Sequence, residues 1–238
     1  MASAQSVHVR PSGVDPHGTI DLLSRWLAGV ADAPALAWLD SELDRQRAGL
    51  DEQRLAIALG SVRRRLGKHA LALSAEDIAQ ADAWRSGWQP QLWGTDEAAR
   101  VALLLATDRN DNGAFSARVD KLCATAEINE LIAYLKGFAV FPAPQALHAR
   151  AREAARSSAT PVFQAIACNN PYPFDYFDQP AWNQVVIKCI FVGAELESIV
   201  GLHARRNPEL LAMLRDFVAE RHAAGRPLPD SVHRFIAE

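Results

Sequence analysis

Cysteine is scarce in this sequence, and its spacing excludes two kinds of site. The 238 residues contain three cysteines, which are Cys123, Cys168 and Cys189. An odd number of widely spaced cysteines without a Cys-x-x-Cys pair is typical of neither a disulfide framework nor a zinc site. We expect three buried thiols in a reducing compartment, because free cysteine packs as a small apolar side chain.

Long apolar runs are also missing. The most apolar stretch, residues 185–196, contains Lys188 and is shorter than the ~20 residues that a membrane-spanning helix requires. Residues 1–18 carry two prolines and two glycines but no apolar core of a secretory signal. We therefore expect a flexible N-terminal tail over residues 1–18 and a cytoplasmic protein without direct membrane insertion.

Neither a basic patch nor a known catalytic motif is present. The formal net charge is −3 and the 25 basic residues are spread along the chain, which argues against a nucleic-acid partner. The seven histidines form no His-Glu-x-x-His or Glu-x-x-His pattern. No Gly-x-Ser-x-Gly, Walker A or dinucleotide-binding fingerprint occurs. The sequence therefore indicates neither a metal nor a cofactor.

What the sequence does contain is helical periodicity with capping residues. Asp51 is placed as the N-cap of a helix in which Leu55 and Leu59 fall on one stripe. Ile57 lies across from that stripe, which predicts a helix that is covered on two sides. Ser74 begins another capping pattern, with acidic residues in the first turn after it.

The periodicity predicts an all-α fold. We expect about ten helices in an antiparallel, HEAT-like two-layer stack, with residues 19–238 forming a single domain because no linker divides them. No stretch alternates with period 2 for long enough to predict a strand. A tryptophan-rich connector covers residues 84–93. Three further helices are expected at about 114–126, 128–140 and 143–157.

The densest unusual segment covers residues 168–184 and reads Cys-Asn-Asn-Pro-Tyr-Pro-Phe-Asp-Tyr-Phe-Asp-Gln-Pro-Ala-Trp-Asn-Gln. Its prolines end the preceding helix, and Asp178 is placed to cap the helix that begins near Pro180. That helix is apolar nearly all round. Its Lys188 therefore needs a carboxylate partner or access to water, and Asp175 or Glu195 is expected to supply the carboxylate.

Aromatic rings with polar tips suit a ligand pocket or a partner surface. We therefore predict that this segment binds a ligand or a partner. The candidate residues are Asn169, Asn170, Tyr172, Asp175, Tyr176, Asp178, Trp182, Asn183, Gln184 and Lys188. Two alternatives stay open: the turn only caps two helices and fills the gap between them, or the function lies in an oligomer surface.

These residues resemble the signature of the EboA family. The similarity extends over about residues 60–227, with His222 standing where the family is expected to have Trp. The most specific segments are Cys168-Asn-Asn-Pro-Tyr-Pro-Phe-Asp-Tyr-Phe-Asp178, Trp182-Asn-Gln184, Lys188 and Phe191-Val-Gly193. Less specific segments are Arg65-Leu-Gly-Lys68, Gly87-Trp-x-Pro90, Trp93, Ala99-Arg-Val-x-Leu-Leu104, Gly201-Leu202, Glu220-Arg221 and Ala223-Ala-Gly-Arg226.

The resemblance implies an all-helical protein from a secondary-metabolite gene cluster that is linked to moving a scytonemin-type precursor. It implies no catalytic residues. We accordingly expect a non-catalytic binding or scaffold protein of a prenylated or aromatic metabolite pathway. Its partners would be a small amphipathic metabolite or other enzymes of the same cluster. The alternative is an enzyme that modifies a pathway intermediate, with Asp175 or Asp178 as base and Lys188 as electrostatic helper.

Overall fold

The computed structural model of the chain describes residues 14–226 and 228–237. Within these ranges it contains thirteen α-helices, three short 3-10 turns and no strand, apart from one isolated bridge between Ala70 and Gly94. The predicted all-α fold is confirmed. No helix in the described ranges has both the length and the apolar character needed to cross a bilayer.

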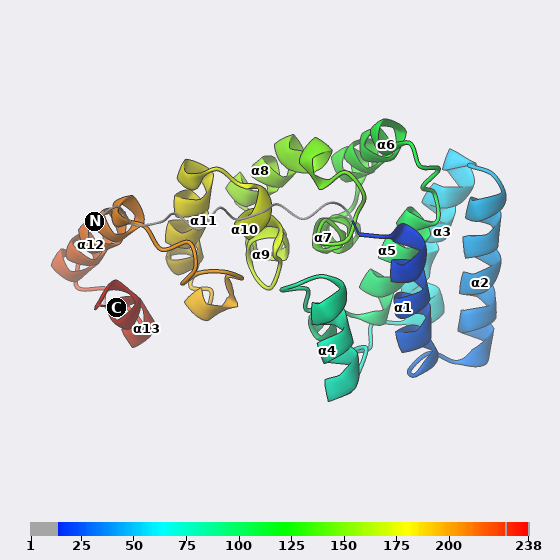
Figure 1. Cartoon of the computed structure of the whole chain (residues 1–238), viewed down its shortest axis with the longest axis horizontal. Coiled ribbons are helices and arrows are strands. Elements are labelled where there is room, and N and C mark those ends of the chain that lie inside the picture. The colour runs from blue at the N-terminus through cyan, green and yellow to red at the C-terminus, as the bar shows by residue number, and fades with distance from the viewer. Residues whose placement is uncertain (1–13, 227, 238) are drawn as a thin grey trace.

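The helices follow one another with short connections, and the molecule is elongated (Figure 1). The α-helices are α1 (Pro16–Ala28), α2 (Ala33–Ala48), α3 (Glu52–Leu66), α4 (Ala75–Trp84), α5 (Thr95–Leu105), α6 (Asn112–Thr125), α7 (Ile128–Gly137), α8 (His148–Arg156), α9 (Thr160–Ala167), α10 (Tyr172–Tyr176), α11 (Gln179–Phe191), α12 (Pro208–Ala223) and α13 (Asp230–Ala237). The 3-10 turns are Pro90–Leu92, Pro144–Leu147 and Leu196–Ser198.

Packing passes in series from one end of the molecule to the other. Helix α5 contacts α1, α2, α3 and α7, and every residue from Ala98 to Leu105 in it is buried. From α7 the contacts continue to α9, then to α11 and α12, while α6 covers α7 and α8 covers α9 (Figure 1). The HEAT-like stack stays a prediction, although this serial packing is what such a stack requires.

The capping residues act as the sequence predicts. The Asp51 carboxylate accepts a hydrogen bond from the Arg54 backbone N–H at 2.9 Å, and the Ser74 hydroxyl accepts one from the Asp77 N–H at 3.1 Å. Asp77 returns a contact by accepting from the Ser74 N–H at 3.1 Å, which completes a capping box. These bonds satisfy backbone groups that the first turn of a helix leaves without partners.

Several boundaries differ from the sequence-based expectation. Helix α1 begins at Pro16, so the last residues of the expected 1–18 tail are helical, whereas residues 1–13 lie outside the described part. Asp15 explains the early start, because its carboxylate accepts from the backbone N–H of His17 and of Gly18. The prediction for Ile57 is wrong: it is 58% exposed, so α3 is covered on one side only.

Helix α11 ends at Phe191, so Glu195, which the sequence offers as a partner of Lys188, lies beyond the helix. Gly193 follows with a φ of +73°, a left-handed conformation that ends the helix. A short helix, α10, lies inside the segment that the sequence presents as a turn. Residues 168–184 are therefore more ordered by local backbone bonds than a loop would be.

Candidate functional site

The aromatic turn, defined here as residues 170–183, is mostly enclosed by its neighbours. The Asn170 amide donates to the carbonyls of Leu135 at 3.1 Å and Ala165 at 3.0 Å, and its oxygen accepts from the Tyr172 N–H at 3.0 Å. The amide nitrogen thus links the turn to α7 and α9, and the amide oxygen holds the turn's own backbone.

Tyr172 is fully buried among other rings. Its hydroxyl donates to the Pro144 carbonyl at 2.6 Å, and its ring lies 4.8 Å from Tyr176 and 5.6 Å from Phe138, centroid to centroid. Burial raises the pKa of the Tyr172 phenol, which keeps the hydroxyl as a donor. Tyr176 is also buried, so both phenols belong to the core.

Asp175 forms a buried ion pair with Arg85, which also donates to the Ala139 carbonyl at 3.0 Å. The predicted pair between Lys188 and Asp175 or Glu195 is therefore wrong. The Lys188 ammonium instead donates to two main-chain carbonyls, at 2.9 and 2.7 Å. These belong to Ala155 and Ser157 at the end of α8, where a positive charge is favourable because the carbonyls have no helical partners.

Asp178 caps α11 as predicted. Its carboxylate accepts from the Ala181 N–H at 2.9 Å and pairs with Arg152 at 2.8 Å. The hydrogen bond from Ala181 is the main cause that lowers the pKa of Asp178. Burial is the next largest effect and opposes it, while the nearby Arg152 lowers the pKa further.

Trp182 and Asn183 pack between α11 and the segments next to it. Trp182 is 0% exposed, and the Arg205 guanidinium lies 4.7 Å from its ring centroid. Asn183 is also buried, and its oxygen accepts from the Asn207 amide at 2.9 Å.

The predicted binding site stays a prediction, and the structure divides its ten residues into enclosed and open side chains. Direct ligand contact does not fit six of the ten candidates, because their side chains are enclosed in the core and a ligand would reach them only if the core opened. These six are Asn170, Tyr172, Asp175, Tyr176, Trp182 and Asn183. For these six residues, the alternative that the turn caps helices and fills the gap between them accounts for their contacts. Asn169, Gln184 and Lys188 border open hollows instead.

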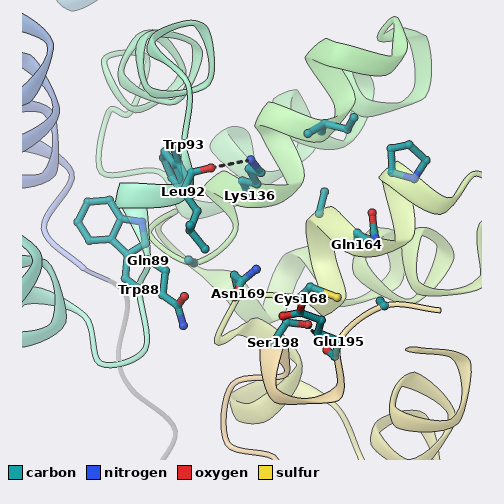
Figure 2. Close-up of a pocket in the computed structure, with 15 residues that line it drawn as sticks. Trp88, Gln89, Leu92, Trp93, Lys136, Gln164, Cys168, Asn169, Glu195 and Ser198 are labelled. Carbon is teal, nitrogen blue, oxygen red and sulfur yellow. Dashed lines mark hydrogen bonds between the residues drawn. The ribbon is translucent and has the colours of Figure 1, made fainter. Parts of the chain in front are cut away.

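Asn169 lines a hollow of about 400 Å³ that we call the indole cleft. The cleft is bordered by Trp88–Trp93 of the connector, by α7, by residues 161–169 at α9, and by residues 194–198. Figure 2 shows Trp88 and Gln89 on one side of it and Gln164 on the other, with the Asn169 amide pointing into the space between.

A packed set of indoles forms one wall of this cleft. Trp88 and Trp93 are 2% and 4% exposed, and their ring centroids are 5.7 Å apart in an edge-on arrangement. Trp26 packs on the other side of Trp88 at 5.4 Å and donates its N–H to Asp77 at 2.9 Å. The Trp88 N–H, by contrast, is buried and has no partner within the described ranges. The wall is therefore rigid and retains one unused donor.

Gly87 allows the connector to pack closely against Pro171 and Val200. Its φ is +76°, and a Cβ at this position would come within 2.6 Å of Val200 Cγ1 and 3.3 Å of Pro171 Cβ. Only glycine adopts this conformation without strain and leaves room for such close packing. The contact holds Trp88 next to the segment that contains Asn169.

Three side chains that line the cleft carry amides without partners of their own. Gln89, Gln164 and Asn169 are half-buried, and their amides make no hydrogen bond to any group in residues 14–226 or 228–237. Asn169 has a left-handed backbone, with a φ of +54°, and its N–H donates to the Ser198 carbonyl at 2.6 Å. Asparagine tolerates this conformation better than most residues, and strained backbone is concentrated at functional sites.

The charged groups at the cleft largely neutralise one another. Lys136 pairs with Glu97 at 2.7 Å and also contacts the Leu92 carbonyl at 3.5 Å (Figure 2). Glu195 is exposed at the rim. The surface that a ligand would meet therefore consists mainly of partly exposed apolar side chains, such as Leu92 and Ile132, and of neutral amides, with the indoles largely buried behind them.

Cys168 places a thiol in the same cleft. Cys123 and Cys189 are buried as predicted, but Cys168 is only half-buried. The Cys189 thiol lies within hydrogen-bonding reach of the Cys168 sulfur and at 3.5 Å from the Glu195 carbonyl. The hydrogen bond from Cys189, supported by Ser198, lowers the pKa of Cys168 although burial opposes it, and the same contact raises the pKa of Cys189.

Sequence reasoning missed the other half of this site. Trp88, Gln89 and Gln164 were not among the candidates, because neither the connector nor α9 carries a chemical motif. One signal was available: the Gly87-Trp-x-Pro90 segment and the segment that begins at Cys168 both carry the family resemblance, and they meet in this cleft. No cluster of three or more metal-ligating side chains occurs in the described ranges.

Comparison with known proteins bears on the whole chain. A family model described as metabolite traffic protein EboA matches residues 19–237. Neither the curated proteins nor the solved structures include a match. The family match covers nearly the full length of the sequence and confirms the resemblance that the Cys168 segment suggested. The chain therefore belongs to the EboA family.

Proposed function

We propose that the protein binds a small, largely neutral metabolite with an aromatic or amphipathic body in the indole cleft, and releases it unchanged. The observation that carries this proposal is that three unpaired amides, those of Gln89, Gln164 and Asn169, line one hollow beside a tightly packed set of indoles. The description of the family as metabolite traffic proteins agrees with a carrier.

The size and lining of the cleft fit such a ligand. A volume of about 400 Å³ is within the range of small-molecule sites, which are typically about 300–1,000 Å³ with an apolar lining and a few polar groups. The partly exposed side chains of Leu92 and Ile132 offer apolar surface to a ring. Amides both donate and accept, so they orient carbonyl or hydroxyl groups. A half-buried amide without a partner gains a hydrogen bond when such a group arrives.

The geometry supports binding more than the alternative of catalysis by Asp175, Asp178 and Lys188. The Asp175 carboxylate is buried against Arg85, Asp178 caps α11, and Lys188 is bound to two carbonyls. None of the three lines the indole cleft. A general base must reach the proton that it abstracts, and these groups are committed to other contacts.

The wider setting also belongs to the proposal. We place the protein in the cytoplasm, in a prenylated or aromatic secondary-metabolite pathway, where it handles or helps to translocate a precursor. In this proposal it acts as a scaffold, in the sense that enzymes of the same pathway dock on it to deliver or collect the ligand. The support for this setting is the family membership.

The test is the small-molecule content of protein purified from its own host. Organic extracts are compared by mass spectrometry for the wild type and for the double variant Gln89→Ala/Gln164→Ala. The matched control is Gln53→Ala/Gln145→Ala, at two exposed glutamines outside the cleft. At about 1 kcal/mol net per hydrogen bond, the cleft variant should retain roughly thirtyfold less compound.

The control should carry as much compound as the wild type. Wild-type protein that carries no compound, or equal loss in both double variants, would contradict binding in the cleft. Conversion of the extracted compound by the purified protein would favour the enzyme alternative instead.

A further inference from the structure

A second hollow, between α8 and α11, has a different chemistry from the indole cleft. It has a volume of about 420 Å³, and we call it the basic groove. Its polar lining comes from Arg152, Arg156, Gln184 and Lys188. We propose that the basic groove binds the oxyanion of a small amphipathic molecule, with the apolar body of that molecule lying along the groove floor. This site does not depend on the proposed function of the indole cleft.

The charge balance of the groove is positive. Three cationic side chains line it, and no Asp or Glu is among the lining residues in the described ranges. Asp178 offsets one cation through its pair with Arg152. Arg156 is exposed in the last turn of α8 and has no ion pair or hydrogen bond within residues 14–226 and 228–237. Its guanidinium therefore offers its whole planar set of donors to a carboxylate or phosphate group.

Lys188 is held at the groove with part of its donor capacity unused. Its ammonium donates to the carbonyls of Ala155 and Ser157, and it lies 4.7 Å from the ring centroid of Phe163. An ammonium has three N–H donors, so one remains for a ligand. Desolvation lowers the pKa of Lys188, which reflects a charge that has lost water and that an anion would stabilise.

The helix termini at the groove are already satisfied by groups of this chain. At the start of α11, Pro180 has no N–H and the Ala181 N–H donates to Asp178, so this terminus adds no free donor. The C-terminus of α8 is nearby and carries partial negative charge. Lys188 occupies its exposed carbonyls, however, and so removes much of the repulsion that an anion would otherwise meet.

The floor of the groove is apolar. Ala155, Pro180 and Ala181 present apolar surface to it, and the buried side chains of Phe177 and Val185 lie beneath them. An inorganic anion alone would leave this surface in water. An oxyanion attached to a ring or short chain would cover the floor as well as neutralise the cations.

A matched pair of fluorescent probes tests the proposal with the full chain. The first is 8-anilinonaphthalene-1-sulfonate, and the second is N-phenyl-1-naphthylamine, which has the same apolar body without the sulfonate. Each is titrated into the wild type, Arg156→Gln and the control Arg63→Gln, an exposed arginine on α3. Far-ultraviolet circular dichroism establishes that all three proteins are folded.

The wild type should bind the sulfonate more tightly than the neutral amine. Arg156→Gln should weaken the sulfonate about tenfold, as expected for loss of a charge-assisted contact, and leave the amine unchanged. Arg63→Gln should bind both probes like the wild type. Equal affinity of the wild type for the two probes, or unchanged sulfonate binding in Arg156→Gln, would overturn the proposal.

A further variant distinguishes binding in the basic groove from binding in the indole cleft. Asn169→Gly removes an amide from the cleft and leaves the groove intact, so sulfonate binding should stay at the wild-type value. A sulfonate affinity that falls in Asn169→Gly but not in Arg156→Gln would place the probe in the cleft and overturn the assignment to the groove.

Discussion

Two adjacent asparagines illustrate the difference between the aromatic turn and the indole cleft. Asn170 is buried, and all its amide hydrogen bonds go to main-chain groups. Asn169, one residue earlier, has a left-handed backbone that directs its amide into the cleft, where it has no partner in the described ranges. Identical side chains are thus enclosed in the core or left open to a hollow at two successive positions of the chain. The residues that stand out in the sequence by their chemistry, such as Tyr172, Asp175 and Trp182, are mainly buried in the core.

The largest expected difference between the two regions is in folding stability. Trp182→Ala removes a fully buried indole of the aromatic turn, so the free energy of unfolding should fall by about 3–5 kcal/mol. Urea unfolding followed by circular dichroism measures the change. A folded Trp182→Ala protein of wild-type stability would mean that the turn is not the core element described above.

A smaller effect is expected at the edge of the turn. Asp178→Ala removes the N-cap of α11, so the free energy of unfolding should fall by about 1 kcal/mol. The folded state lowers the pKa of Asp178, so its contribution is present above the ordinary pKa of an aspartate. It is lost as the pH falls through the lower, folded-state value. Unfolding at pH 7 and at pH 2 should therefore show the variant approaching the wild type in acid; a constant difference would contradict this.

The cleft should instead show a change of reactivity with little change of stability. The Cys189 thiol lowers the pKa of Cys168, so alkylation of Cys168 by iodoacetamide should reach half its maximal rate below pH ~8.5, the ordinary cysteine value. Peptide mass spectrometry follows this residue separately from the others. The Cys189→Ala variant should move the midpoint upward. A midpoint that does not respond to Cys189 would show that the two sulfurs are not coupled.

Local structure could be predicted well from the sequence because its causes are local. Asp51, Ser74 and Asp178 cap helices where the sequence places them, since a cap depends on residues within one turn. The partner of Lys188 was not predictable in this way. It is the end of α8, more than thirty residues away in sequence, and only the packing of α8 beside α11 brings the two together.

Only part of the candidate site could be predicted, because the rest depends on contacts between segments that are distant in sequence. The segment from Cys168 attracts attention by composition, and it does supply Cys168 and Asn169 to the cleft. Burial of Tyr172 and Trp182 could not be seen in advance, because an aromatic ring with a polar tip looks the same in a core and in a pocket. Gln89 and Gln164 have no distinguishing neighbours in sequence and become notable only where α9 meets the connector.

The most direct test of the cleft compares two identical substitutions at residues with the same backbone conformation. Asn169 and Asn110 have φ values of +54° and +56°, and Asn110 is exposed outside the cleft. Glycine tolerates this conformation, so Asn169→Gly and Asn110→Gly each remove an amide without adding backbone strain. The measurement is the amount of metabolite that co-purifies from the native host. We expect Asn169→Gly to lose at least about fivefold, as one hydrogen bond implies, and Asn110→Gly to match the wild type; equal amounts in both variants would contradict the account.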